Sequence, residues 1–236
     1  MTVLYWIRTV FLLVPVIAIY TIVFGVISLA GGLFDGSGRF AHRVAQVWAR
    51  CILVTSGVRV DRRGELPPES ESCVFVVNHA SFYDVPIMFA ALPRQLRLMA
   101  KAALGRVPFI GWHLMRGGHV LVNRTNPGAG IFKRMQRMAR AGASLMVFPE
   151  GGRSDDGVVQ KFKGGIFLLA IENGLRVVPI SLDGSRRVMP TGRFSVHPAR
   201  VVVTIHPPIP TKGLTRDDAR TLAAQAQQIV SDGLGT

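Results

Sequence analysis

The feature that most constrains this chain is a run of 26 residues without a charged side chain, from Thr9 to Phe34. A helix needs about 20 apolar residues to cross the hydrocarbon core of a bilayer, so this run is long enough to span one. Pro15 and Gly25 interrupt the run, which leaves a one-sided or re-entrant insertion open as well. A cleaved signal peptide is the competing interpretation, but its apolar region normally covers only about 7–15 residues. We therefore expect an N-terminal membrane anchor.

The distribution of charge places the rest of the chain relative to that membrane. Lys and Arg number 28 against 14 Asp and Glu, giving a formal net charge of +14 and indicating an anionic partner such as a membrane surface, a phosphorylated substrate or nucleic acid. Arg8 alone precedes the anchor, whereas six arginines follow it between residues 39 and 63. By the positive-inside rule the main domain is expected on the cytoplasmic face.

The segment after the anchor has the pattern of an amphipathic helix. Arginines recur at helical spacing between Arg39 and Arg50, and an apolar face adjoins them. This pattern is expected of a helix at an anionic headgroup layer, and a helix packed on the globular domain is the alternative. The apolar residues of that face are Phe40, Val44, Val47, Trp48, Cys51 and Ile52. We assign residues 1–57 to the anchor and this helix, and residues 58–236 to a second domain.

Residues 58–236 alternate short apolar runs with helical patterns. Strands are predicted at Val58–Asp61, Val74–Val77, Leu96–Ala100, His119–Val122, Leu145–Phe148, Val177–Leu182 and Val201–His206. Helices are predicted at Val85–Ala91, Gly130–Ala141 and Gly164–Asn173, and a last helix opens with a capping box between Thr215 and Asp218. This alternation predicts an α/β domain with a mixed sheet flanked by helices, and with catalytic groups on loops beyond strand ends.

One such loop follows a strand in the segment NHASFYD. His79 and Asp84 are five residues apart, which on a continuous helix would place them about 140° from each other, so a turn must intervene for them to meet. In one interpretation Asp84 or Ser81 caps the next helix and His79 is only a turn residue. In the other, Asp84 accepts a hydrogen bond from one imidazole nitrogen and leaves the second nitrogen as a base.

Three further segments favour the second interpretation, because together they carry a resemblance. NHASFYD matches the NHxxxxD signature of the glycerophospholipid acyltransferases, GHVLVNR resembles their second block and FPEGGRS their third. The short segment Val178 to Ile180 is similar to the fourth block, and the order of the four is that of the family. The chain looks most like the 1-acylglycerol-3-phosphate acyltransferases, which make phosphatidic acid.

The resemblance implies roles for individual residues. His79 would be the general base oriented by Asp84, and the attacking hydroxyl would belong to 1-acylglycerol-3-phosphate. Substrate-binding roles would fall on Lys101, Arg124, Glu150, Gly151 and Arg153, with Lys101 near the reacting carbonyl, the arginines on the acceptor phosphate, and Glu150 holding an acceptor hydroxyl or ordering Arg153. Taken singly, the arginines also suit a solvated surface, and Lys101 a strand-end lysine.

The same resemblance implies the partners. The acyl donor would be acyl-CoA or an acyl-carrier protein, used as a co-substrate, and no other cofactor is expected. The remaining histidines show no ligand spacing, so no metal site is expected.

Departures from the family pattern leave the acceptor open. Asn123 stands where Asp is common, Gly152 where Thr is, and Ala103 where Glu often is. Another lysolipid, such as a lyso-ornithine lipid or lysocardiolipin, is the nearest alternative. A membrane-attached anion-binding module without catalysis is the alternative from another class. No RNA-binding or zinc-finger pattern appears, so we expect no nucleic-acid partner.

Overall fold

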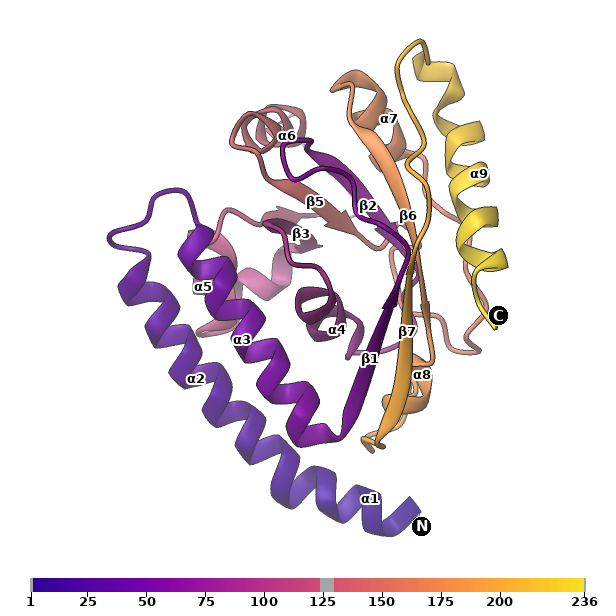
Figure 1. The fold of residues 1–236 in the computed structure, drawn as a ribbon. Coiled ribbons are helices and arrows are strands. Elements are labelled where there is room, and N and C mark those ends of the chain that lie inside the picture. Colours follow the sequence, from indigo (N-terminus) through magenta and orange to yellow (C-terminus); the bar gives the residue numbers. More distant parts are fainter. Residues whose placement is uncertain (1, 124–129, 236) are drawn as a thin grey trace.

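The domain is built on a seven-stranded sheet (Figure 1), seen in a computed structural model that describes residues 2–123 and 130–235. The strands are β1 (Val58–Arg63), β2 (Cys73–Val77), β3 (Leu96–Lys101), β4 (Val120–Val122), β5 (Ser144–Val147), β6 (Arg176–Asp183) and β7 (Ala199–Ile205). Their spatial order is β1-β7-β6-β2-β5-β3-β4, and among these pairs β6–β7 is antiparallel while the others are parallel. The predicted mixed α/β sheet is therefore confirmed, and the parallel strands β2, β3, β4 and β5 end at one edge.

Helices cover both faces of the sheet, as the continuous apolar runs of its central strands require. The helices are α1 (Thr2–Arg8), α2 (Val14–Gly31), α3 (Arg39–Ser56), α4 (Asp84–Ala91), α5 (Ile110–Arg116), α6 (Gly130–Arg140), α7 (Gly165–Glu172), α8 (Ser185–Val188) and α9 (Ala219–Asp232), with short 3₁₀ turns η2 (Ala102–Arg106) and η3 (Arg216–Asp218). Alternate residues of β2 enter two separate cores. Cys73, Phe75 and Val77 join the core under α3 and α4, while Val74 and Val76 join the core under α6, α7 and α9.

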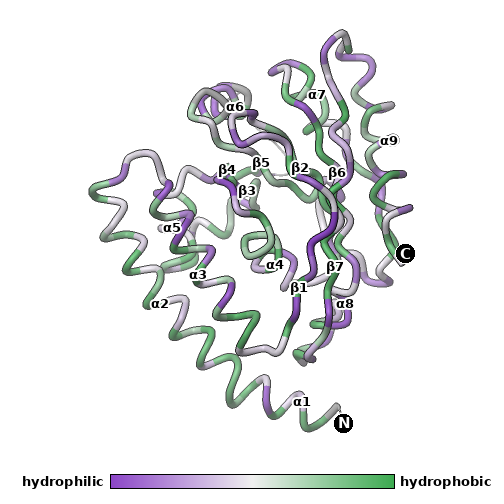
Figure 2. Tube along the Cα trace, viewed as in Figure 1, coloured by the Kyte–Doolittle hydropathy of each residue, from purple (hydrophilic) through white to green (hydrophobic). Residues whose placement is uncertain are grey.

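The apolar N-terminal run forms one long helical element. A π-helical turn, η1 (Thr9–Leu13), joins α1 to α2 and accommodates Pro15 near the start of α2. The continuous stretch Val3–Gly31 has 29 residues; its most apolar 18-residue window has a mean hydropathy of 2.8, and only 11% of that window is buried. By length and composition it could cross a membrane. Figure 2 shows this apolar element running beside α3 along one flank of the molecule.

Helix α3 has the predicted amphipathic pattern, and part of its predicted apolar face is buried in the protein. Ile52 packs in the core under α3 and α4, and Trp48 packs against that core, while Val44 is also buried. Phe40 and Val47 remain exposed on the outer side. The boundary assigned at residue 57 falls at Gly57, between α3 and β1, but the two segments share this core.

The last helix begins as predicted. Thr215 accepts from the main chain of Asp218, and the Asp218 carboxylate accepts from the N–H and the hydroxyl of Thr215, which completes the capping box. The chain then forms η3 before α9 begins at Ala219. Helix α5, between β3 and β4, was not predicted from the sequence.

Candidate active site

The end of β2 is fixed by a side chain that mimics main-chain pairing. All five residues of β2 are buried between β5 and β6. The next residue, Asn78, accepts a hydrogen bond from the N–H of Leu182 through Oδ1 at 2.8 Å and donates from Nδ2 to the Leu182 carbonyl at 3.0 Å. This bidentate bond ties the strand end to β6, so His79 leaves the sheet from a fixed point. No sequence pattern indicates this role for Asn78.

His79 and Asp84 are in direct contact. Nδ1 of His79 lies 2.6 Å from Oδ2 of Asp84. The same carboxylate oxygen accepts the main-chain N–H groups of Ala80 at 2.7 Å and Ser81 at 2.9 Å. Asp84 is wholly buried at the start of α4, whereas the His79 side chain is 15% exposed. Asp84 therefore organises the turn and contacts the imidazole at once, whereas the N-cap of α4 is Tyr83, without a side-chain cap hydrogen bond.

The main chain of His79 is clamped from the segment that follows β5. Its N–H donates to Oε1 of Glu150 at 2.6 Å, and its carbonyl accepts the N–H of Ser154 at 2.7 Å. The second carboxylate oxygen of Glu150 accepts the N–H of Gln160 at 2.9 Å. Both oxygens of Glu150 are thus bonded to the main chain. Burial raises the pKa of Glu150 to about 7. The two hydrogen bonds lower this pKa, but by less than burial raises it.

Aromatic rings complete the surroundings of the histidine. The imidazole of His79 stacks on the ring of Phe148, with centroids 4.1 Å apart and planes 19° apart. Nδ1 is held by the carboxylate and one ring face by Phe148, which restrains the imidazole in two directions. The partly exposed ring leaves Nε2 as the nitrogen that can exchange a proton with a substrate.

The FPEGGRS segment brings Arg153 to the same edge. Its guanidinium carbon lies 3.3 Å from the centre of the Phe82 ring, in the loop between His79 and Asp84. Nη1 of Arg153 is buried and has no hydrogen-bond partner among the described residues. A buried donor without an acceptor is unusual in a protein, and a guanidinium suits the planar fork of a phosphate or carboxylate.

The other predicted residues of this segment have structural settings of their own. Gly151 has a φ of 78°, in the left-handed region that glycine adopts without strain, and closes the turn by donating to the Phe148 carbonyl. The hydroxyl of Ser154 donates to Asp156 Oδ1 at 2.8 Å and accepts the N–H of Gly157. That hydroxyl is therefore engaged away from His79.

Lys101 is the last residue of β3 and is exposed at the edge where β2 and β5 also end. Arg124, predicted to bind the acceptor phosphate, lies outside the described residues. Within the described ranges, no group of three His, Cys, Asp or Glu side chains is close enough to hold a metal ion.

An apolar cavity of about 230 Å³ opens beside this edge. It lies between α2, α3, α4 and α5, and Phe24, Trp48, Phe82, Phe89 and Leu114 are among its lining residues. Phe82 connects it to the site, since the same ring supports Arg153. The edge thus combines an imidazole held by a carboxylate, a guanidinium with a free donor, and space for an apolar group.

Comparison with known proteins decides the family. Residues 58–183 match the family described as Acyltransferase, more than half of the chain. This chain belongs to the acyltransferase family. A chloroplastic 1-acyl-sn-glycerol-3-phosphate acyltransferase of Brassica napus is 36% identical to it over 207 residues, which are 84% of this chain and 60% of that protein. A lyso-ornithine lipid O-acyltransferase of Pseudomonas aeruginosa is 26% identical over 211 residues, 80% of this chain and 77% of that protein.

The fold of this acyltransferase-family member is also found in a solved structure. The crystal structure of the 1-acyl-sn-glycerophosphate acyltransferase of Thermotoga maritima superposes with a TM-score of 0.82 at 22% identity, covering 98% of this chain and 94% of that chain. That likeness establishes the shared fold. The chain spans about three-fifths of the length of its Brassica relative.

Proposed function

We propose that this protein transfers a fatty acyl group from an acyl thioester to the free hydroxyl of 1-acylglycerol-3-phosphate, giving phosphatidic acid. The observation that carries the proposal is the 2.6 Å contact between His79 Nδ1 and a wholly buried Asp84. Such a contact fixes the tautomer and leaves Nε2 as a base, as in the acid–histidine half of a hydrolase triad. The match of NHxxxxD and the acyltransferase names of the relatives support the same reaction.

The chemical step needs only a base. Nε2 of His79 takes the hydroxyl proton as the oxygen attacks the thioester carbonyl, and a tetrahedral intermediate forms. The intermediate collapses with cleavage of the carbon–sulfur bond, and the imidazolium returns its proton to the departing thiolate. Since a thioester is already activated, no enzyme nucleophile is required. The engaged hydroxyl of Ser154 is consistent with this direct transfer.

Each charged group at this edge of the sheet is proposed to bind one part of the substrates. Lys101, at the end of β3, is proposed to stabilise the developing oxyanion. Arg153 is proposed to bind the acceptor phosphate, because its buried Nη1 lacks an acceptor among the described residues. Arg124 remains proposed as a second phosphate ligand from the sequence resemblance alone. Gly151 would let the main chain approach the acceptor closely.

Glu150 is proposed to position His79. Both of its carboxylate oxygens accept main-chain N–H groups, one of them from His79 itself. Removing the carboxylate would therefore move the base away from Asp84 and the substrate. This role accounts for an acidic residue in the block without a direct bond to the acceptor hydroxyl or to Arg153.

The apolar cavity between α2, α3, α4 and α5 is proposed to take the acyl chain of the thioester. Its lining is almost entirely hydrocarbon, and it meets the site at Phe82. Transfer of a hydrocarbon chain from water into such a space is favourable by about 0.8 kcal/mol for each buried methylene. The donor itself is proposed to be acyl-CoA or an acyl-carrier protein.

Membrane attachment is proposed to be one-sided. Arg8 donates to the carbonyls of Thr55 and Ser56, and Ser28 bonds His113 Nδ1, so both ends of the long N-terminal helix are held by the domain. A helix that crossed the bilayer would draw these partners into hydrocarbon with it. The exposed apolar side of α1 and α2 would instead enter one leaflet, with the domain on the cytoplasmic face. Membrane lipids would thus be partners as well as the source of the acceptor.

The test is to offer purified full-length protein a panel of lysolipids with acyl-CoA and with acyl-carrier protein. We expect 1-acylglycerol-3-phosphate to give the highest kcat/KM. Preference for a lyso-ornithine lipid, the acceptor class in the name of the Pseudomonas relative, would keep the chemistry and replace the acceptor. Absence of thioester consumption with every acceptor would refute the enzymatic proposal and leave an anion-binding module.

A further inference from the structure

A second cavity, of about 810 Å³, lies at the opposite end of the sheet from His79. Arg97 at the start of β3 lines it, together with the residues that lead into β4 and the inner side of α6. Lys101, at the catalytic edge, follows four residues later on β3, a separation of about 13 Å along an extended strand. Gly36, Ser37 and Gly38, between α2 and α3, form another wall. We refer to this space as the hairpin cavity.

The hairpin cavity is strongly basic. Four arginines line it, and no Asp or Glu is among its lining residues: Arg97, Arg116, Arg134 and Arg137. Asp35 lies near enough to interact with Arg97, and its carboxylate already accepts the main-chain N–H groups of Ser37 and Phe40. Four positive charges against this one negative charge leave an excess of three. A cavity that concentrates one sign of charge attracts counter-ions of the other.

Two of the four arginines shape the wall. Arg116 donates from Nε and Nη2 to the Gly32 carbonyl at 3.2 and 3.0 Å, and Arg97 donates from Nη2 to the Ser37 carbonyl at 2.7 Å. These bonds fix the connection between α2 and α3 against the domain. Arg97 is buried, so its charge is held at the back of the cavity.

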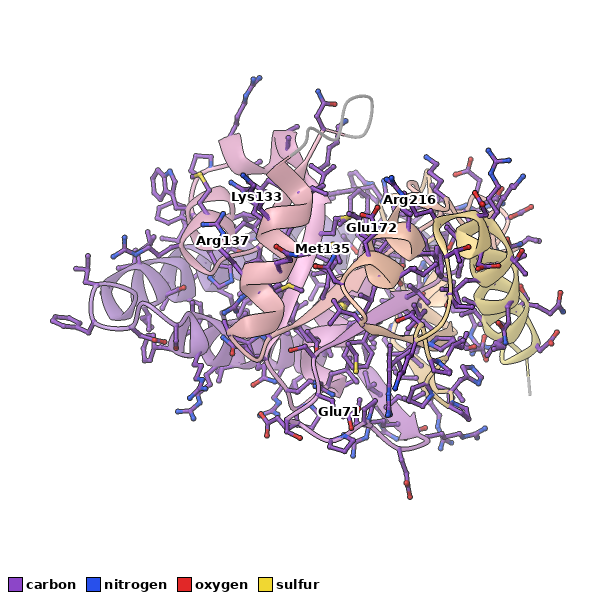
Figure 3. The ribbon with its side chains drawn as sticks, turned by 90° about the horizontal axis from the view of Figure 1, so that it is seen from above. Glu71, Lys133, Met135, Arg137, Glu172 and Arg216 are labelled. Atoms are coloured by element: carbon purple, nitrogen blue, oxygen red, sulfur yellow. The ribbon has the colours of Figure 1, made fainter. Side chains whose placement is uncertain are left out.

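The other two arginines are available to a ligand. Arg134 and Arg137 are exposed, lie three residues apart on α6, and form no ion pair with any described residue. Residues at this spacing are neighbours on a helix surface, where like charges repel unless an anion lies between them. In Figure 3, Arg137 extends from α6 on the side of the N-terminal helices.

The wall of the cavity is continuous with the apolar surface of the N-terminal helices. Leu33 is 71% exposed and Phe34 is 92% exposed at the end of α2, two to three residues before Gly36 enters the cavity wall. Leu33 and Phe34 continue the exposed apolar surface of α2, which includes Val26 and Ile27. A contiguous apolar surface of this kind marks a site of interaction, and beside a basic cavity it suits a lipid surface. A bilayer that received Leu33 and Phe34 would present its headgroups at the mouth of the cavity.

We propose that the hairpin cavity binds a phosphate-bearing anion, presented as the headgroup of an anionic phospholipid at the α2–α3 connection. Arginine forks bind phosphate oxygens in pairs, and the volume accommodates a glycerophosphate group. Bound there, the lipid would lock the connection and orient the domain on the membrane. This site is separate from the catalytic edge, and the proposal does not depend on which lysolipid is acylated.

The test uses full-length protein in neutral detergent micelles, with phosphatidylglycerol or phosphatidylcholine added and retained lipid counted by native mass spectrometry. The variant is Arg134→Gln with Arg137→Gln. The matched control is Lys212→Gln with Arg220→Gln, which removes two exposed positive charges near and on α9. We expect wild type and control to retain one phosphatidylglycerol, and the α6 variant to bind it at least about tenfold more weakly. Arg134→Lys with Arg137→Lys should recover part of the affinity, because the charge returns without the fork.

Competition with inorganic phosphate distinguishes the two sources of the anion. No displacement of phosphatidylglycerol by millimolar phosphate supports a lipid site. Displacement, with loss of phosphate binding in the α6 variant, supports the same cavity as a site for free phosphate. Equal retention of phosphatidylglycerol by the α6 variant and the control, or equal retention of phosphatidylcholine by wild type, would overturn the proposal.

Discussion

The histidines in two regions of this molecule differ in their hydrogen-bond partners and in their exposure to solvent. At the catalytic edge, Nδ1 of His79 faces a carboxylate, and its ring stays partly exposed. Around α3 and α5, His42 and His119 are buried and His113 is half-buried, and none of the three is paired with a described carboxylate. Nδ1 of His119 accepts the N–H of Leu98, so this ring is fixed as the opposite tautomer. The position of a proton donor or acceptor therefore decides which histidine can serve as a base.

The histidines around α3 and α5 also have lowered pKa values. Burial, with the charge of Arg97 second, lowers the pKa of His42 and of His113 to about 4. Burial also lowers the pKa of His119, with further contributions from its charged neighbours. These rings remain neutral under ordinary conditions and act as packing groups. Under the proposed mechanism, the reactivity of a histidine in this chain would depend on a carboxylate partner and on access to solvent.

The largest effect is expected from His79→Ala. Loss of the general base should lower kcat by about 10⁴-fold, at the upper end of what such a group contributes. The matched control is His42→Leu, which removes a buried imidazole and should leave kcat within a few-fold of wild type. Steady-state assays with circular dichroism on both variants check this. If both variants fold and lose kcat to a similar extent, His79 is not distinguished from the other histidines as the base.

Asp84→Asn should lower kcat by about 10³-fold. The amide can donate to Nδ1, which would favour the wrong tautomer of His79, as in a triad that loses its carboxylate. KM for the thioester should change little, because the cavity lining is untouched. Measurement of kcat and KM separately tests this, and a rise in KM alone would assign Asp84 to substrate binding.

Arg153→Ala should lower kcat/KM for a phosphate-bearing acceptor by about one to two decades. A hydrogen bond to a charged group is worth about 1.5–3 kcal/mol, and the alanine loses it. Arg153→Lys should restore only part, since an ammonium lacks the planar fork. The informative comparison is a phosphate-bearing lysolipid against a zwitterionic one of equal chain length. Equal losses on both acceptors would indicate that Arg153 only supports the loop through Phe82.

His42→Leu should change stability toward acid. The folded pKa of about 4 lies below the ordinary value of 6.5, so the stability contributed by the neutral ring is complete above pH 6.5 and is lost as pH falls through 4. Removing the ring should recover on the order of 1–3 kcal/mol of that loss. Thermal melts at pH 7 and pH 4 measure it. An unchanged difference between the two pH values would show that this ring titrates normally.

Glu150→Gln should give the smallest effect on stability, with the opposite dependence on pH. The folded pKa of about 7 lies above the ordinary 4.5, so the contribution of the neutral acid is complete below pH 4.5 and is lost as pH rises through 7. Because the amide cannot ionise, the free energy of unfolding of the variant should vary by about 1–2 kcal/mol less across this range than that of wild type. Melts between pH 4.5 and pH 8 test it, and a wild-type slope in the variant would place the raised pKa elsewhere.

Much of this architecture was predictable, because local sequence patterns determine where the strands lie. Each of the seven predicted strands overlaps an observed one, since the apolar runs are short and bounded by turn residues. His79 and Asp84 could be paired from NHASFYD because the motif combines them on one loop. Helix α5 was missed because it has only seven residues, with Pro108 before it and Gly111 within it.

The rest of the site depends on contacts between distant parts of the chain. Asn78 bonds a residue 104 positions away, and the clamp from Glu150 spans 71 positions. Sequence periodicity does not indicate contacts between distant residues. Glu150 was therefore predicted to bind substrate, whereas its carboxylate accepts hydrogen bonds from the main chain. The amphipathic pattern of α3 was ambiguous for a related reason: the same face suits a lipid surface and a protein core, and only tertiary packing decides between them.

The clamps on His79 also set when a newly made molecule can become active. Synthesis runs from the N-terminus, so His79 and Asp84 leave the ribosome well before Glu150, Ser154 and Leu182. Until those residues have emerged, Asn78 has no strand to join and the main chain of His79 has no donor or acceptor to hold it. The apolar helices α1 and α2, by contrast, emerge before all of these residues. A nascent chain would therefore reach the membrane while its base is still unplaced, and would acquire activity only there.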